Sequence, residues 1–456
     1  MPEEEIESAP TTADIPRRTD GLELLGRYQG VEYEDPVYLA RRGDGQMVQL
    51  SFLLFLVIQE TDGVRPTAEI AQRVGRAFGK DVSADNVRHL LEHRLQPLGI
   101  VAEPGAPTAA VTSDAPRNDL LLGLMGRRTL VPPPAVRAAA RALAWLHRPA
   151  VTATVLAAAV AMDLWLFLVH GAMPAVLHSL SSPLPLLTVF ALIVGSLVFH
   201  EFGHASACHH AGATPGRIGC GLYLIWPSLY TDVTDVYRAG RAGRLRTDLG
   251  GVYFNVVYML ALLAGYAVTG HPVLLAAIYL GHFEIFEQLM PTARLDGYYI
   301  LTDVAGVPDL YGRVGPLLRG LLPSRARGDR PAGPVPALTR RARITVTVWV
   351  FTLVPLMLAD LGYGLWNLPR ITATALRSLD ARLHTATAAT VGGHPASALV
   401  AALGVVLLAL PFAGGGWLTV RLLRAVGRRL RPAGDALARS AAQYLVVRAK
   451  RERDQT

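Results

Sequence analysis

Apolar stretches, each long enough to cross a lipid bilayer, constrain this chain more than any other feature of its sequence. A helix needs about 20 predominantly apolar residues to cross the hydrocarbon core of a bilayer. The stretches that meet this requirement lie at about 150–169, 184–208, 250–269, 272–292, 344–366 and 397–420. We therefore expect a mainly α-helical, polytopic membrane protein with about six transmembrane helices, contained in a domain that covers residues 149–425.

Composition and charge support this expectation and indicate an orientation. The 456 residues are 51% hydrophobic and only 18% charged, which suits a membrane domain joined to a soluble part. Arginines cluster before the first stretch and after the second, fourth and sixth, and basic loops face the cytoplasm. Both termini are therefore predicted to be cytoplasmic, with 426–456 as a basic tail. Only the predicted outer loop at 367–396 departs from the rule, because it carries Arg370, Arg377 and Arg382.

The N-terminal part has the pattern of a small soluble α+β domain at 21–102, after a disordered segment at 1–20. Its predicted elements are strands at 33–39 and 47–50, helices at 52–58 and 66–78, a third helix capped by Ser83, and a short strand at 98–101. A hairpin followed by three helices and a returning strand is the order of a winged helix.

In this order and pattern, the domain resembles the PqqD-like domains that bind leader peptides of ribosomally made, modified peptides. The resemblance implies a precursor or leader peptide as partner, received as an added strand at a sheet edge. A DNA-binding winged helix is the alternative. The third helix mixes Asp85 and Glu92 with its basic side chains, which makes a poor clamp for phosphates, so we predict no nucleic-acid partner.

Two further segments separate this domain from the apolar stretches. Residues 103–119 are rich in Pro, Ala, Thr and Ser and are predicted to be a linker. Residues 120–148 are amphipathic and basic on either side of Pro132–Pro134, and we expect them to lie on the membrane surface. A short soluble helix packed on the winged helix is the alternative for this segment.

The motif His200-Glu201-Phe202-Gly203-His204 stands at the end of the second apolar stretch. Positions i and i+4 share one face of a helix, so both imidazoles can bind the same Zn²⁺ ion. Glu201 lies beside them, where it can take a proton from a water molecule held by the metal. The alternative is a pair of helix-end histidines that bind no metal.

Asp296 is the predicted third ligand. The second and fourth stretches run in the same direction across the membrane, so Asp296 should arrive at about the depth of His200 and His204. Zinc in a hydrolase takes three protein ligands and leaves one position for water. Pairing of Asp296 with Arg294 is the alternative.

At these residues the chain resembles the site-2 protease family of intramembrane zinc metalloproteases, which pairs H-E-x-x-H with L-D-G on a later span. Its bacterial peptide zinc metalloprotease branch is similar over most of 120–320, at Leu295-Asp296-Gly297, Arg294–Asp303, Pro227–Asp235 and Trp145–Pro149. Gln288–Pro291 departs from the family's Asn-x-Asn-Pro. The resemblance implies a zinc metalloendopeptidase of the bacterial cytoplasmic membrane that cleaves a ribosomally made precursor peptide, for leader removal or maturation, near the cytoplasmic face.

Other readings stay open at this point. The chain could be a non-proteolytic membrane partner of modification or export proteins with a structural zinc, and its oligomeric state is open. A metal-ion carrier would need more ionisable residues spread over several spans. Glu284 and Glu287 could support the metal site or a water path, or pair with His282. The remaining residues of interest are His209 and His210, expected to point off the zinc face, and Asn255, which by resemblance could orient substrate.

Overall fold

The structure is a computed structural model that describes residues 15–102, 125–181, 183–223, 226–291, 295–314 and 338–406, and single positions from 409 to 424. The predicted linker, the basic tail and most of the segment at 1–20 lie outside these residues. The chain divides into two compact units. The first comprises Met1–Leu120, Thr129–Gly219 and Leu229–Trp366, and the second comprises Leu121–Arg128, Cys220–Ser228 and Asn367–Thr456.

The described residues are mainly helical, and three helices are long and apolar enough to cross a membrane. They are α5 (Pro149–Leu164) with its π-helical continuation to His170, α7 (Pro183–His210) and α9 (Gly250–Thr269). Their bounds agree closely with the first three predicted stretches. Three such helices indicate a membrane protein.

The other predicted stretches take a different form, so six spans are not seen in the described residues. Helix α10 (Pro272–Gln288) has 17 residues and ends before the predicted limit. The fifth stretch lies within α13 (Arg340–Val391), a helix of 52 residues that continues through most of the loop predicted at 367–396. This loop is rich in Ala, Leu and Arg, which are strong helix formers. The sixth is represented by the apolar helix Pro395–Val406.

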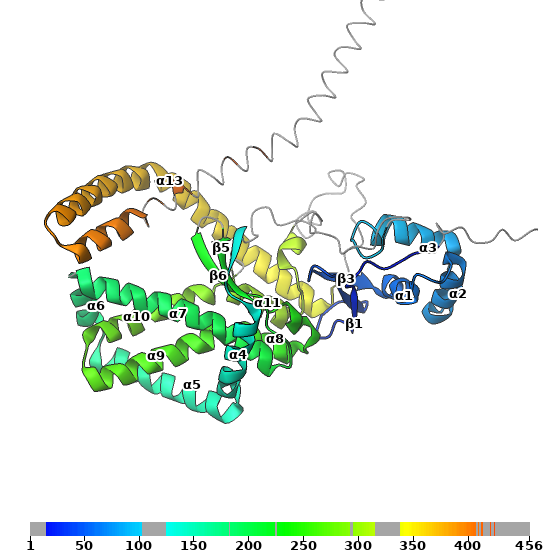
Figure 1. Cartoon of the computed structure of the whole chain (residues 1–456), viewed down its shortest axis with the longest axis horizontal. Helices are drawn as coiled ribbons and strands as arrows, with labels where there is room; N and C mark the ends of the chain where they lie inside the picture. Colours follow the sequence, from blue (N-terminus) through cyan, green and yellow to red (C-terminus); the bar gives the residue numbers. More distant parts are fainter. Residues whose placement is uncertain are drawn as a thin grey trace, which may run out of the picture. The chain divides into compact units, whose positions relative to one another are not determined.

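Helix α7 is central to the membrane part. It packs against α9, α10, α4 (Pro133–Leu143) and α8 (Arg241–Asp248), and Figure 1 shows α7, α9 and α10 running side by side. The loop predicted at 170–183 contains a further helix, α6 (Met173–Ser181), which packs on α7 and α10. Side chains of these helices form one apolar core, which includes Met162, Val176, Val189, Met259 and Ile278.

Helices α7 and α9 cross with their backbones in contact. A Cβ atom added to Gly250 would lie 2.6 Å from the carbonyl oxygen of Gly203, and a Cβ on Gly203 would meet the carbonyl of Gly250. Only glycine permits this approach at both positions. The crossing places the first turns of α9 against the H-E-x-x-H segment of α7.

The N-terminal domain begins with an antiparallel sheet in the order β1-β2-β3. Its elements are β1 (Glu23–Arg27), β2 (Val37–Arg41), β3 (Met47–Ser51), α1 (Phe52–Glu60), α2 (Thr67–Phe78) and α3 (Ala84–Leu90), which a π-helical turn extends to Leu95. The predicted cap of the third helix is confirmed, since Ser83 accepts a hydrogen bond from the backbone of Asn86. Strand β1 was not predicted. The strand predicted at 98–101 is wrong, because Val101 makes only a single bridge, with Arg18.

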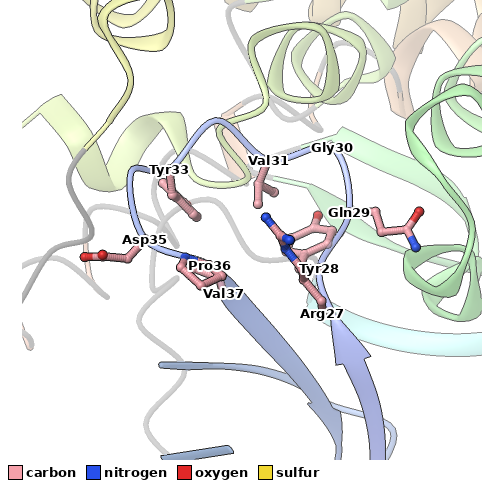
Figure 2. Close-up of a pocket in the computed structure, with 9 residues that line it drawn as sticks. All are labelled: Arg27, Tyr28, Gln29, Gly30, Val31, Tyr33, Asp35, Pro36 and Val37. Carbon is pink, nitrogen blue, oxygen red and sulfur yellow. The ribbon is translucent and has the colours of Figure 1, made fainter. Parts of the chain in front are cut away.

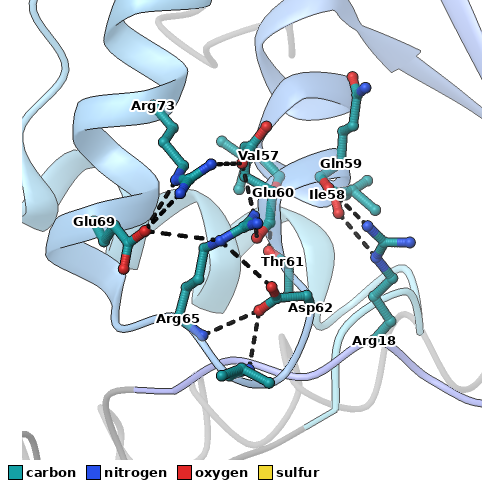
Figure 3. A network of polar contacts seen from close by, with 11 residues as sticks. Arg18, Val57, Ile58, Gln59, Glu60, Thr61, Asp62, Arg65, Glu69 and Arg73 are labelled. Atoms are coloured by element: carbon teal, nitrogen blue, oxygen red, sulfur yellow. Dashed lines mark hydrogen bonds and ion pairs between the residues drawn. The ribbon is translucent and has the colours of Figure 1, made fainter.

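A polar network fixes the turn between α1 and α2 (Figure 3). The Arg18 guanidinium donates to the carbonyl groups of Ile58 and Gln59, at 2.9 and 2.8 Å, and so caps the end of α1. Arg65 pairs with Glu60 at 2.8 Å. These side chains are partly exposed, and each such ion pair contributes little to the free energy of unfolding. The main effect of the network is therefore to hold the turn in one geometry.

The segment predicted to lie on the membrane surface instead forms a strand and a packed helix. Strand β4 (Met125–Val131) joins β5 (Ile218–Tyr223) and β6 (Trp226–Thr231) in a second sheet, in the order β4-β5-β6. Helix α4 buries Val136 and Ala140 against Ala205 of α7 and Ile218. Its apolar face is therefore covered by protein.

Arg244 links α8 to two other parts of the first unit. Its Nε atom lies 2.8 Å from Oδ1 of Asp303 on α11 (Asp296–Ala305), and both side chains are largely buried. Its Nη1 atom donates to the carbonyl of Gln29, in the loop between β1 and β2, at 3.0 Å. The guanidinium also lies over the ring of Tyr28, 5.0 Å from its centroid. One side chain thus joins the N-terminal domain, α8 and α11.

We predict that Arg244→Leu lowers the free energy of unfolding by about 3–5 kcal/mol, because it leaves the buried Asp303 carboxylate without its partner. Denaturant titration of the detergent-solubilised protein measures the effect. Arg246→Leu, on the exposed side of the same helix, is the matched control and should change stability little. Equal losses in the two variants would contradict the role of the ion pair.

Candidate metal centre

The two histidines of the predicted motif meet on the last turns of α7. His200 is 2% exposed, and its Nε2 atom lies 3.1 Å from Nε2 of His204, one turn later. Helix α7 continues without a break from the apolar run of Leu184–Val198 into this segment, so the helical spacing of the pair is maintained.

Asp296 joins them from a different helix. Helix α10 ends at Gln288, the chain turns, and Asp296 is the first residue of α11. Its Oδ2 atom lies 3.2 Å from Nε2 of His200, and its Oδ1 atom lies 3.4 Å from Nε2 of His204. The structure therefore brings together the three predicted ligands. Arg294, the alternative partner of Asp296, lies outside the described residues.

These three side chains form a group that could hold a metal ion. Their ligand atoms all lie within 4.8 Å of one another, and no other group of three His, Cys, Asp or Glu side chains in the described part of the chain does so. Oδ2 of Asp296 is buried and has no hydrogen-bond partner among the described residues. A cation at this point would satisfy an otherwise unpaired carboxylate oxygen.

The backbone of α8 fixes the orientation of His204. Its Nδ1 atom lies 2.8 Å from the carbonyl oxygen of Thr247. A carbonyl only accepts hydrogen bonds, so Nδ1 carries a proton, and in the neutral imidazole Nε2 then presents its lone pair to Asp296 and His200. Lone pairs that face one another at this distance repel unless a proton or a metal ion lies between them.

Asp296 meets the histidines as a carboxylate. Burial by itself raises the pKa of Asp296, but the imidazoles of His204 and His200 lower it by more, and the net pKa lies below its usual range. The ionised form is the one that binds cations. The charge of the group therefore suits a positively charged ligand.

Asn255 supports His200 from α9. Its Oδ1 atom lies 3.0 Å from Nδ1 of His200, and the asparagine is 1% exposed. A side chain so buried has no surface to offer a substrate. The structure therefore places Asn255 behind the histidine, in contrast to the substrate contact that the family resemblance implied.

Glu201 is held by the end of β6. The hydroxyl of Thr231 lies 2.6 Å from Oε2 of Glu201 and 2.9 Å from its backbone carbonyl oxygen. Glu201 is 7% exposed and follows His200 directly in α7. Thr231 therefore sets the position of the carboxylate beside the metal-binding group.

Gly251 forms the wall of the site on the α9 side. A Cβ atom at this position would lie 2.5 Å from Nε2 of His204 and would also meet Nε2 of His200. The backbone of α9 thus packs directly on the ligand atoms. Any larger residue would fill the space in which an ion has to sit.

Sequence reasoning missed Thr231, Thr247 and Gly251. The pair Gly250-Gly251 at the start of an apolar stretch is a signal for close helix packing that could have identified Gly251. Thr247 acts through its carbonyl group, which every residue has. His209 and His210, which follow the motif on the same helix, do not belong to the group.

A separate pocket of about 340 Å³ lies in the N-terminal domain (Figure 2). It is lined by the loop between β1 and β2 and the strand ends beside it, from Arg27 to Val37. Tyr28 and Gln29, two of its lining residues, also contact Arg244. The pocket therefore adjoins the connection between the N-terminal domain and α8.

Comparison with protein-family models, with curated proteins and with solved structures finds no match to this chain.

We predict that the purified protein contains one divalent metal ion per chain. His204→Ala and Asp296→Asn should each remove most of it, because each deletes a ligand. Gly251→Ala should do the same without replacing a ligand, because its methyl group would lie against the ligand nitrogens and occupy the site. Elemental analysis of the detergent-solubilised protein measures the content.

His209→Ala and Gly265→Ala are the matched controls. His209 lies on the same helix outside the group, and an added Cβ on Gly265 of α9 meets only a leucine methyl at 3.4 Å. Full metal content in Asp296→Asn would remove Asp296 from the ligand set, and full content in Gly251→Ala would place the ion elsewhere.

Proposed function

We propose that this protein is an intramembrane zinc metalloendopeptidase that cleaves a ribosomally made precursor peptide near the cytoplasmic face of a bacterial membrane. The convergence of His200, His204 and Asp296 on one point, with Glu201 beside them on a membrane-length helix, is the observation that carries the proposal. The motif resemblance to site-2 proteases supports the same reaction.

The spacing of the ligand atoms supports zinc. Tetrahedral zinc with bonds of about 2.0–2.1 Å keeps its ligand atoms about 3.3 Å apart. The two Nε2 atoms lie 3.1 Å apart, Oδ2 of Asp296 lies 3.2 Å from His200, and its other oxygen, Oδ1, lies 3.4 Å from His204, so the carboxylate can offer either oxygen at a suitable distance. Two imidazoles and one carboxylate are also a donor set that zinc hydrolases use.

The number of ligands favours a catalytic over a structural zinc. Structural zinc sites are closed by four protein ligands, whereas catalytic sites have three and keep an open position. The group contains three ligand side chains within the described residues. This observation argues against the alternative of a non-proteolytic partner that holds zinc only for stability.

Each residue has a distinct role in the proposed reaction. His200, His204 and Asp296 hold the zinc, which when bound supplies Lewis acidity toward the scissile carbonyl and water. Glu201 accepts a proton from the attacking water and delivers it to the leaving amine nitrogen. Thr231 keeps the Glu201 carboxylate in position for both transfers. Because a helix hides its carbonyl groups, the substrate has to be extended at the site.

The N-terminal domain is proposed to hold the leader of the precursor. Strands β1 and β3 are the two edges of its sheet in the described residues, and an edge can accept an extended peptide as a further strand. The pocket beside β1 and β2 offers a place for a peptide side chain. Such binding would supply selectivity that a site within the membrane part cannot provide alone.

We predict that Glu201→Gln keeps its metal but loses cleavage by several orders of magnitude, because the amide cannot accept the proton of water. Mass spectrometry of the co-expressed precursor is the measurement. Gln retains the shape of the side chain, and the metal content checks that the site has formed. Unchanged cleavage by this variant would refute the proposed mechanism.

We also predict that free leader peptide competes with the precursor. Binding of the leader tethers the precursor and gives its cleavage site an effective concentration of about millimolar at the metal centre. Loss of leader binding should therefore raise KM far more than it lowers kcat. The assay uses full-length protein, with a scrambled leader as control. Deletion of residues 1–102 should raise KM and abolish the competition. Competition that persists in the deletion variant would place leader binding outside the N-terminal domain.

A further inference from the structure

We infer that Glu284 of α10 is a positioning residue that fixes His200 in the tautomer able to bind a metal ion. The inference rests on the metal site of the proposed function, and it assigns a role to a carboxylate that is linked to a ligand through Asn255.

Three side chains from three helices form a chain of hydrogen bonds. Oε1 of Glu284 accepts from Nδ2 of Asn255 on α9 at 2.9 Å. Oδ1 of the same amide lies 3.0 Å from Nδ1 of His200 on α7. Asn255 is therefore the bridge between the carboxylate and the imidazole.

Glu284 sets the order of donors and acceptors along this series of hydrogen bonds. The amide nitrogen of Asn255 donates to Glu284, which is the order that the ionised carboxylate requires because it has no proton to donate. The amide oxygen then faces His200, and because it only accepts, Nδ1 of His200 has to carry the proton. Nε2 is left with a lone pair, directed at Asp296 and His204. Without Glu284, the amide could turn over and select the opposite tautomer.

This role also accounts for a carboxylate in an apolar helix. A charge in such a place is costly unless it is paired. Pairing with His282, the alternative from the sequence, is not seen. The two ring nitrogens of His282 lie 3.0 Å from Oδ1 of Asp163 and 2.9 Å from the carbonyl oxygen of Ile278. In the described residues the Glu284 carboxylate hydrogen-bonds to Asn255 and to Ser196 of α7, and its Oε2 atom has no hydrogen-bond partner.

Zinc affinity of the full-length protein tests the inference, measured by competition with a chelating dye. Glu284→Leu should weaken binding by about 10–100-fold, the usual effect of losing a group that orients a ligand. Glu287→Leu is the matched control, because Glu287 is an exposed carboxylate one turn further along α10, and it should bind zinc like the native protein. The absorption spectrum of Co²⁺-loaded protein reports whether the coordination geometry is retained.

Two substitutions that exchange the amide and the carboxylate distinguish a positioning role of Glu284 from a packing role. Asn255→Asp alone places two carboxylates against each other and should weaken zinc binding. Adding Glu284→Gln restores the order, since Gln can donate to the aspartate, which accepts from His200. The double variant should therefore bind zinc at least tenfold more tightly than Asn255→Asp alone, the lower limit for an orienting group. A packing role for Glu284 predicts no such recovery.

The outcomes distinguish this inference from the proposed function. Equal zinc affinity in Glu284→Leu and native protein, or no recovery in the double variant, would overturn the inference alone. Zinc binding that depends on Glu284 without any precursor cleavage would refute the peptidase and leave the inference standing. A native protein that binds no zinc would overturn both.

Discussion

The backbone contact between α7 and α9 at Gly203 and Gly250 is the constraint on which the candidate metal centre depends. It brings the first turn of α9 against the two histidines, so that Gly251 can form a wall and Asn255 can reach Nδ1 of His200. Side chains at the crossing would clash with the facing backbone and push these helices apart, and the hydrogen bond of 3.0 Å between Asn255 and His200 would be stretched. Gly203 and Gly250 therefore affect the site through the short separation of the two helices that they permit, without any contact of their own to a ligand.

The ligands of this site could be predicted from sequence because their signals are local or topological. The spacing of His200 and His204 is a property of one helix, and Asp296 followed from the direction of two apolar stretches. The supporting groups could not be predicted in the same way. Thr231 and Thr247 reach the site only through the packing of elements that are distant in the chain, and for Glu284 the sequence left support of the metal site open beside a water path and a pairing with His282. No periodicity in the sequence carries that information.

The fold shows the same difference between local signals, which could be predicted, and long-range packing, which could not. Three apolar stretches predicted helices with nearly correct bounds, because length and hydropathy decide whether a helix can cross a bilayer. Strand β4 was missed because its partner β5 lies far along the chain, so its pairing leaves no local pattern. The loop at 367–396 was predicted because it is the gap between two apolar stretches, whereas its local helix propensity extends α13 through this gap to Val391.

Arg244 shows how the N-terminal domain and the metal-binding group share structural elements. Arg244 precedes Thr247 by one helical turn on α8, and Thr247 orients His204. Its partner Asp303 lies two turns after Asp296 on α11. The loop that contacts Arg244 through Gln29 therefore rests on the two helices that hold one ligand and orient another. Because helices move as rigid bodies, a displacement of this loop would be transmitted to both sides of the site at once. The proposed recognition of a peptide in the N-terminal domain would in this way be mechanically connected to the geometry of the candidate metal-binding group.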